Sequence, residues 1–287
     1  EAMNFRLDAS YQLDANNSIG ANFGFLRNPK QTWNGDMSSS ILQDEELSEN
    51  SDSHADFFWQ KNNLSSNIYY VGKIGKLGID FNTDWLWSKE YQNDVTKEQY
   101  QEVGMNAQSQ TVHSLTNKNY HLLASKLVLS YPLLGGELSL GGEYSNTHRT
   151  SKYQVVPTNF VSDDDSRITE SMTSSFLTYS RDFGNVSIEA GLRYEYIDFN
   201  YYEYGKYVPE QSKSYGNWFP SLSVSLPVGK VQMQLSYAAD INRPSYQNLR
   251  SGIQYDNRYT YETGNPFLVS EISKNLNYEL AYKWLTF

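Results

Sequence analysis

The fold is decided by a strictly alternating stretch, VQMQLSYAADIN, at residues 231–242. Every second side chain from Val231 to Ile241 is apolar or aromatic, and those between them, from Gln232 to Asn242, are small or polar. Successive side chains of a β-strand point to opposite faces, so a period of two indicates a strand whose faces meet different surroundings. This stretch therefore predicts a long strand with one apolar face and one polar face.

The same alternation recurs along the chain, whereas helical periodicity is scarce. Eleven segments carry it: 4–13, 18–25, 64–71, 77–87, 119–131, 137–145, 173–181, 186–198, 217–226, 231–242 and 271–284. The clearest segments approach the length of about 9–11 residues that a strand needs to cross a membrane, whereas ordinary strands have about 5–6. We therefore expect an all-β protein with eleven strands in this chain.

The connections between these segments alternate strictly in length. The short ones are 14–17, 72–76, 132–136, 182–185 and 227–230, and the long ones, expected to be loops, are 26–63, 88–118, 146–172, 199–216 and 243–270. Each short one holds Gly, Pro, Asn or Asp, which favour tight turns. In an up-and-down antiparallel sheet, this alternation places every short turn at one end. The pattern predicts a transmembrane up-and-down β-barrel with short periplasmic turns and long extracellular loops.

Aromatic side chains lie near the ends of the predicted strands, with aliphatic residues between them. Those at strand ends are Trp85, Trp87, Tyr194, Tyr196, Tyr282 and Trp284. Aromatic girdles around an apolar band are typical of membrane barrels. A large β-sandwich with tyrosines packed on its core would show the same alternation, and periodicity alone does not separate the two folds.

Composition narrows the class of protein further. The 287 residues carry a formal net charge of −10 with a pI near 4.9, which argues against a nucleic-acid partner because such proteins need a basic face. No cysteine is present, so disulfides, thiolate metal sites and cysteine nucleophiles are excluded. The mean hydropathy of −0.64 is typical of a soluble protein. In alternating strands, however, the polar residues lower the average, so a membrane barrel can have the same value.

The chain is expected to form one partial domain. Residues 1–287 read as a single partial outer-membrane β-barrel, with no plug domain and no signal peptide, because alternation begins almost at Glu1. If the short turns are periplasmic, the first strand starts at the cell surface and the eleventh ends in the periplasm. Complete bacterial barrels of this kind have an even number of strands, so eleven strands predict a partial barrel.

Four short motifs in the last quarter of the sequence carry a family resemblance. They are WFPSLS at 218–223, LPVGKV at 226–231, INRPSY at 241–246 and GNPFL at 264–268. This part of the chain, 217–284, resembles the TonB-dependent receptor-like outer-membrane β-barrel family, of the kind abundant in Bacteroidetes-type Gram-negative bacteria. The resemblance implies an outer-membrane location, a plug domain inside a many-stranded barrel and a periplasmic TonB-type energy-coupling partner.

The expected function is TonB-dependent uptake of a nutrient, with a glycan, a peptide or a siderophore-like ligand as equal candidates. Outer-membrane lipid is the expected surrounding, and a surface lipoprotein is a further candidate partner. The alternative is a non-transporting outer-membrane or surface β protein whose loops mediate adhesion or complex assembly. A barrel-supported hydrolase is a weaker third reading, because no G-x-S-x-G motif occurs. No enzyme activity and no cofactor are expected.

Candidate ligand-binding residues lie in the long connections and on the polar faces. Five loop aromatics offer broad apolar faces with polar tips, and they are Trp33, Trp59, Tyr201, Tyr202 and Tyr204. They bind ligand or pack the loops on each other, and the sequence does not separate these roles. The polar faces would line a lumen with Arg6, Asp8, Asp80, Asp84, Glu137, Glu143, Glu189, Arg193, Glu195, Asp240, Glu279 and Lys283.

Two arginines, Arg193 and Arg243, are further candidate ligand contacts. Arg243 has an alternative role, in which it and the turn at 264–266 simply fold the connection between 231–242 and 271–284.

Metal binding is not expected. Three of the four histidines fall in expected loops or at a loop edge, while His121 starts a strand, and none has ligand spacing. The acidic run 163–165 and the acidic residues in 44–49 lack the spacing of a calcium loop, so both are expected to be solvated.

Overall fold

The computed structural model describes residues 1–282 and 285–286, and most of them lie in β-strands. The strands are β1 (Met3–Asp14), β2 (Asn17–Gln43), β3 (Glu46–Ile74), β4 (Leu77–Glu102), β5 (Gln108–Leu133), β6 (Gly136–Val156), β7 (Asp164–Phe183), β8 (Val186–Glu203), β9 (Lys206–Tyr207), β10 (Lys213–Val228), β11 (Val231–Asn242), β12 (Ile253–Asn257), β13 (Thr260–Thr263), β14 (Glu271–Tyr282) and β15 (Leu285–Thr286). A single turn of 3₁₀-helix, η1 (Pro209–Gln211), precedes β10. Among the described residues, no helix is long and apolar enough to cross a membrane.

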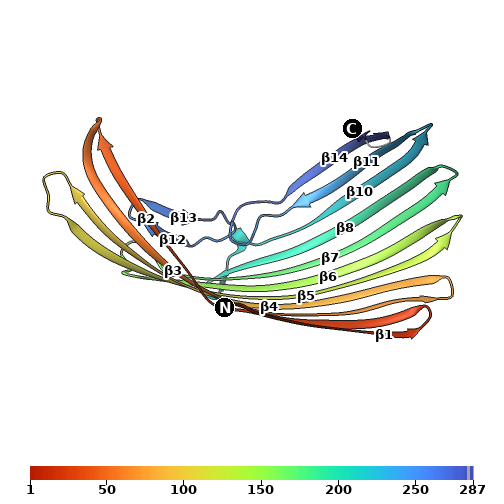
Figure 1. The fold of residues 1–287 in the computed structure, drawn as a ribbon, viewed down its shortest axis with the longest axis horizontal. Helices are drawn as coiled ribbons and strands as arrows, with labels where there is room; N and C mark the ends of the chain where they lie inside the picture. Colours follow the sequence, from red (N-terminus) through yellow and green to blue (C-terminus); the bar gives the residue numbers. More distant parts are fainter. Residues whose placement is uncertain (283–284, 287) are drawn as a thin grey trace.

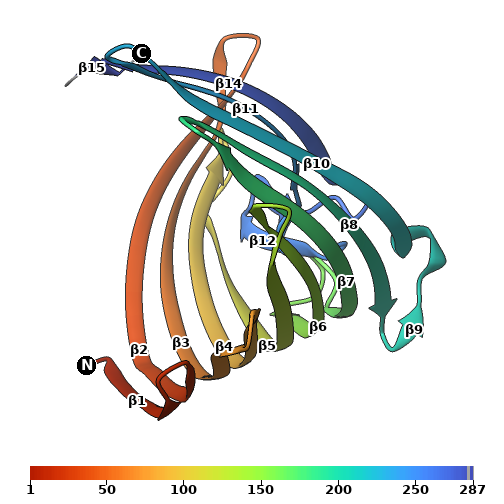
Figure 2. The same ribbon diagram turned by 90° about the vertical axis from the view of Figure 1, so that its right-hand side faces the viewer.

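The strands form one strongly curved antiparallel sheet that follows chain order (Figures 1 and 2). Its order is β1-β2-β3-β4-β5-β6-β7-β8-β10-β11-β14-β15, with β9 beside β8, while β12 and β13 form a separate hairpin in the hollow of the sheet. Among the described strands, β1 lies at one margin, and β14, with the two-residue β15 paired to its end, lies at the other, so the sheet is an open, partial barrel. The two-sheet sandwich considered from the sequence is not the fold.

All eleven predicted strands are present, as β1–β8, β10, β11 and β14. The last two residues of the segment 271–284, Lys283 and Trp284, lie outside the described residues. The five short connections each contain two residues and gather at one rim (Figure 1). In one of them, Leu134 and Gly135 both have positive φ, 51° and 78°, which matches the twist of the flanking strands. The predicted sidedness of the connections is therefore confirmed.

The long connections were predicted as loops, and for four of the five this is wrong. The strands continue through most of 26–63, 88–118, 146–172 and 199–216, so these connections are largely extended hairpins. The first one reverses at Asp44 and Glu45, which adopt positive φ without a glycine. In water the backbone ladder does not need a continuous apolar face, so the sequence there lacks a clear period of two. Of the five long connections, as far as the structure describes them, 243–270 is the one that is mostly outside the sheet.

The convex face of the sheet is apolar along its short-turn half. Strand register places Leu129, Leu140, Leu177 and Leu192 in one row across β5 to β8. Three of them are exposed by 53%, 47% and 45%. Such a contiguous exposed row is costly in water and indicates contact with an apolar surrounding.

The concave face carries the charge. Neighbours in the register share a face, which places Glu143 and Glu195 on one concave row through Ser174. Arg193 is two residues from Glu195 on β8 and lies on the same side. In their short-turn half, strands β5 to β8 therefore separate an apolar convex side from a polar concave side, as the alternation predicted.

Candidate functional site

Residues 243–270, which we call the strap, fold back into the hollow of the sheet. Figures 1 and 2 show this segment, with its hairpin β12–β13, lying against the concave side of the long-connection half. Among the described residues, the strap is the long connection that leaves the sheet over most of its length, so it decides which part of the concave face stays open. The contacts between strap and sheet therefore define the candidate site.

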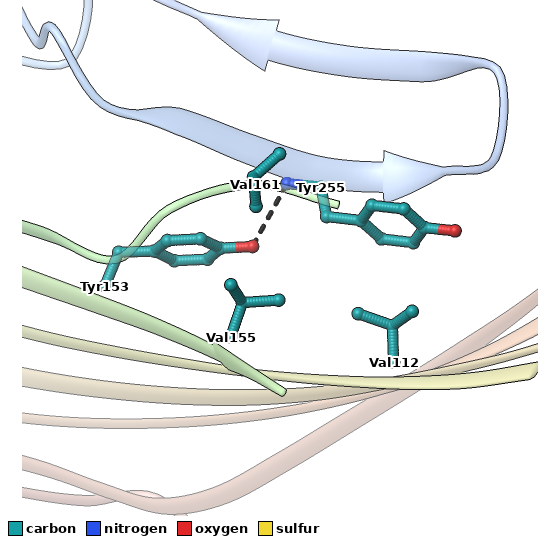
Figure 3. Close-up of a cluster of buried hydrophobic side chains, with 5 residues drawn as sticks. All are labelled: Val112, Tyr153, Val155, Val161 and Tyr255. Atoms are coloured by element: carbon teal, nitrogen blue, oxygen red, sulfur yellow. Dashed lines mark hydrogen bonds between the residues drawn. The ribbon is translucent and has the colours of Figure 1, made fainter. Parts of the chain in front are cut away.

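One hydrophobic cluster packs the strap hairpin onto the extensions of β5 and β6. Figure 3 shows Val112, Tyr153, Val155, Val161 and Tyr255 packed together. The backbone N–H of Tyr255 donates to the hydroxyl of Tyr153 at 3.0 Å, so a polar group of the strap finds a partner inside the apolar cluster. Each of these side chains is at most 8% exposed.

A second cluster packs the first half of the strap onto β7 and β8. Its buried members are Ile168, Ile197, Phe199, Tyr201 and Leu249. The hydroxyls of Tyr201 and Ser251 lie 2.8 Å apart, and Tyr246 donates to Glu170 at 3.0 Å. The strap is thus fixed at both halves by apolar packing with satisfied polar groups.

Two carboxylates of the sheet bind the end of the strap hairpin through hydrogen bonds and an ion pair. Glu98 on β4 is 3% exposed and accepts hydrogen bonds from the Tyr255 hydroxyl at 2.6 Å and the backbone N–H of Arg258 at 2.7 Å. Glu49 on β3 accepts from the Tyr259 hydroxyl at 2.6 Å and pairs with Arg258 at 3.0 Å. Burial and the neighbouring Glu98 carboxylate raise the pKa of Tyr255, so its hydroxyl remains a donor.

An ion-pair chain anchors the base of the strap. Arg193 on β8 lies 3.3 Å from Glu143 and 2.9 Å from Glu195, and Arg243 at the start of the strap also pairs with Glu195. Glu195 has a side chain only 5% exposed. A carboxylate this buried needs its cations, since an unpaired buried charge is strongly destabilising.

The turn at 264–266 lies against the start of the strap. The N–H of Asn265 donates to the carbonyl of Asn248 at 2.6 Å. A Cβ on Gly264 would lie 2.6 Å from that same carbonyl oxygen, so only glycine fits this close approach. The turn of the GNPFL motif therefore packs on the backbone of Asn248, two residues after the end of the INRPSY motif.

The structure brings together only some of the predicted site residues. Trp33 on β2 and Trp59 on β3 lie on the concave face: register places Trp33 in one row with Phe57, Asp94, Ser114 and Val155, and Trp59 in the next row with Tyr153. The Trp33 and Phe57 rings are 4.7 Å apart, and Trp33 is 67% exposed. We call Trp33, Phe57 and Trp59 the rim patch.

The three predicted tyrosines lie elsewhere. Tyr201 is 1% exposed beneath the strap. Tyr202 points to the convex side, where Arg167 lies 4.0 Å from its ring and Tyr207 packs edge-on. Tyr204 lies in the turn between β8 and β9 with φ 47°. The predicted arginines, Arg193 and Arg243, are in the ion-pair chain.

The sequence reasoning missed several residues of this region. Phe57 precedes Trp59 by two residues, so the period of two could have placed both on one face. Asp94 occupies the row of Trp33 and Phe57, and burial raises its pKa to about 6. One oxygen of this carboxyl has no hydrogen-bond partner among the described residues. Tyr246 and Tyr255 had no signal in the sequence, because their partners are on distant strands.

The histidines and acidic runs form no metal centre in the part of the chain that the structure describes. All four histidines lie in strands β3, β5 and β6, so the prediction that three lie in loops or at a loop edge is wrong. His54 lies 2.6 Å from Asp36, whose hydrogen bond raises the pKa of the imidazole. In the acidic run, Asp163 accepts from the N–H of Val155 at 3.0 Å, and Asp165 pairs with Lys152 at 2.8 Å.

The curved sheet, its one-sided turns and its two contrasting faces define the wall of an outer-membrane barrel. The chain belongs to the outer membrane protein beta-barrel family, whose family model matches residues 72–287. This match includes the motif-bearing part of the sequence, so the predicted receptor-like barrel family is confirmed, and the protein is located in the outer membrane of a Gram-negative bacterium. A comparison with curated protein sequences gives no match.

Solved structures resemble the chain in fold. The copper transporter OprC is 11% identical over 98% of this chain and 49% of its own, with a TM-score of 0.53. The alcaligin outer membrane receptor FauA from Bordetella pertussis is 12% identical over 99% and 47%, with a TM-score of 0.45. The ferric yersiniabactin uptake receptor FyuA from Yersinia pestis is 12% identical over 99% and 50%, with a TM-score of 0.42. The chain thus spans about half the length of these structures.

Proposed function

We propose that this chain is part of the barrel of an outer-membrane receptor for TonB-dependent uptake of a nutrient. The observation that carries the proposal is the rim patch on the concave face, with Trp33 exposed and Phe57 and Trp59 half-buried, at the end where the long connections gather. The family match and the OprC-like fold support a barrel, and the open rim patch supports a surface for cargo inside it. No enzymatic role is proposed.

The barrel setting is proposed from the two faces of the sheet. The convex leucine row faces outer-membrane lipid, and residues 1–287 act as one part of a larger barrel domain. The margins β1 and β14 pair with further strands of that barrel, because an open backbone edge cannot face hydrocarbon. A plug domain occupies the hollow below the strap, and a periplasmic TonB-type protein supplies the energy. A surface lipoprotein remains a candidate partner at the long-connection end.

Cargo contacts are proposed for the rim patch. Trp33 and Phe57 offer adjacent rings on the uncovered part of the concave face, and Trp59 lies in the neighbouring row. Aromatic faces suit the apolar sides of sugar rings, peptide side chains and the planar groups of siderophore-like ligands. Tyr201, Arg193 and Arg243 support this surface indirectly, because they hold the strap.

The test uses the full-length protein with Trp33→Ala and Trp59→Ala. Each change is expected to weaken cargo binding by about 3- to 10-fold, the range for one aromatic contact. A panel of oligosaccharides, peptides and ferric siderophores is screened by uptake in cells and by binding in detergent. Trp218→Ala is the matched control, since Trp218 is 62% exposed on the convex face. Unchanged binding in both rim variants would contradict the proposed cargo site.

The alternative is a barrel whose surface serves adhesion or complex assembly. The length of the hairpin formed by β2 and β3, which extends to Gln43 and Glu46, favours this reading because it projects a large surface. Loss of a partner without loss of uptake in a variant with that hairpin shortened would support it.

A further inference from the structure

A small cavity lies between the strap and the concave face and is lined by three cationic side chains. Its volume is about 20 Å³. The cationic side chains are Lys118 on β5, Arg149 on β6 and Arg250 on the strap, and the hydroxyl-bearing residues Ser151 and Ser166 complete the sheet side. A cavity needs roughly 10–15 Å³ of such space to hold one water-sized particle, so this one has room for a single small ion.

The three cations differ in how they are neutralised. Lys118 pairs with Glu90 at 3.0 Å, and Arg250 pairs with Glu262 at 3.1 Å. Arg149 forms no ion pair within the residues that the structure describes, and its guanidinium lies over the ring of Tyr246, 5.6 Å from the ring centroid. Burial lowers the pKa of Arg149, the carboxylate of Glu90, which is already paired with Lys118, opposes this shift, and the positive charge of Arg250 adds to it.

An unsatisfied donor points to the same place. The Nε of Arg250 is buried and has no hydrogen-bond partner among the described residues, although its terminal nitrogens reach Gln254 and Glu262. The Arg250 side chain is only 13% exposed. Buried donors almost always have partners, so a lone buried N–H beside an unpaired guanidinium indicates an acceptor.

We propose that this cavity binds one chloride ion, held between Arg149 of the sheet and Arg250 of the strap. The ion accepts charge-assisted hydrogen bonds from both guanidinium groups and so cancels the repulsion between them. Because the two arginines lie on opposite sides of the contact, the ion joins the strap to the sheet. This binding site does not involve cargo, so the chloride proposal can be tested separately from the uptake proposal.

The direct test is a crystal of the full-length protein grown in bromide, with anomalous scattering measured at the bromine edge. A bromide peak in the cavity, in contact with Arg149 and Arg250, is expected. A cavity that holds only water in bromide would overturn the proposal.

The second test measures hydrogen exchange of strap amides in detergent, with chloride against gluconate at equal ionic strength. At chloride ten times above its dissociation constant, exchange is expected to slow by about tenfold, since strap opening then requires loss of the ion. In Arg149→Gln the chloride effect is expected to vanish. Lys152→Gln is the matched control, because Lys152 lies on the same strand, is 60% exposed and pairs with Asp165 away from the cavity.

Two further outcomes are decisive. If Arg149→Gln fails to insert, Lys118→Gln replaces it, and a weakened chloride effect is expected because one lining cation is lost. A chloride effect that persists at full size in a folded cavity variant would overturn the proposal, since the ion would then bind elsewhere.

Discussion

The phenolic hydroxyl of Tyr255 donates a hydrogen bond of 2.6 Å to the carboxylate of Glu98, across 157 residues of sequence. Both side chains are buried, at 8% and 3% exposure. Glu98 belongs to the water-exposed extension of β4, beyond the half that carries the convex leucines, whereas Tyr255 belongs to the strap. The bond therefore joins the strap to the extension of β4, which would otherwise face solvent on its concave side.

Tyr255→Phe removes this donor and keeps the ring in its cluster. Loss of a hydrogen bond to a buried carboxylate costs about 1–3 kcal/mol, so the strap is expected to open about 5- to 150-fold more often. Hydrogen exchange of amides 253–263 in the full-length protein measures this opening. Tyr261→Phe is the control, because Tyr261 is 46% exposed and its hydroxyl is no part of the Glu98 contact. Equal exchange in both variants would refute the assigned role.

Glu195→Gln tests the ion-pair chain at the base of the strap. The change leaves Arg193 and Arg243 facing a neutral amide at a buried position, and breaking a buried pair costs about 3–5 kcal/mol. We expect a lower yield of folded barrel and faster exchange of amides near Arg243, measured in detergent. Glu189→Gln on the same face of β8 is exposed and should behave as the native protein does. A similar loss in both variants would show that lumen charge in general, and not this pair, is responsible.

The strands were predictable because the convex face must be apolar over the whole width of the barrel. Residues 231–242 and 186–196 show this directly: each alternates without interruption and lies within a strand. The short turns were predictable because residues such as Gly229 and Gly184, with φ of 64° and 65°, mark reversals of the chain.

The extended hairpins and the strap were not predictable for a different reason. Residues 38–40, for example, are three consecutive serines within β2. A strand in water needs no apolar face to keep its backbone hydrogen bonds, so its sequence need not alternate. The reversal at Asp44 and Glu45 contains no glycine, so the usual turn signal is missing. Contacts such as Tyr255 with Glu98 depend on tertiary approach, which a single sequence does not encode as a local period.

Leu177→Arg tests which face meets lipid. Leu177 lies in the convex leucine row and is 47% exposed. A charge at mid-depth on the lipid face of a barrel costs about 2–4 kcal/mol, so insertion into the outer membrane is expected to fall. The folded fraction is measured by the gel shift between unheated and heated samples. Thr178→Arg is the control on the concave face, next to Gly191 in the register. A fall in Thr178→Arg alone would reverse the assignment of the faces.

Asp94 makes the water-exposed extension of β4 sensitive to pH. Burial raises its pKa to about 6, well above the ordinary value for an aspartate, while the hydrogen bond from Gln92 opposes the shift. The folded state therefore takes up a proton at a higher pH than the unfolded state does. Its carboxylate destabilises the fold above pH 6, and the fold gains stability as the pH falls from about 7 towards 4.

Asp94→Asn keeps an acceptor for Gln92 and removes the titration. At pH 7.5 the free energy of local opening around β4 and β5 is expected to rise by about 1–3 kcal/mol, because the buried charge is absent. Between pH 7.5 and 4.5 the native protein should gain most of this difference while the variant stays constant. Hydrogen exchange of amides 88–118, corrected for intrinsic rates, measures both quantities. Glu102→Gln, at the exposed end of the same strand, should retain the native pH dependence. If Asp94→Asn also retains it, another group carries the titration and the buried carboxyl does not set the stability of this hairpin.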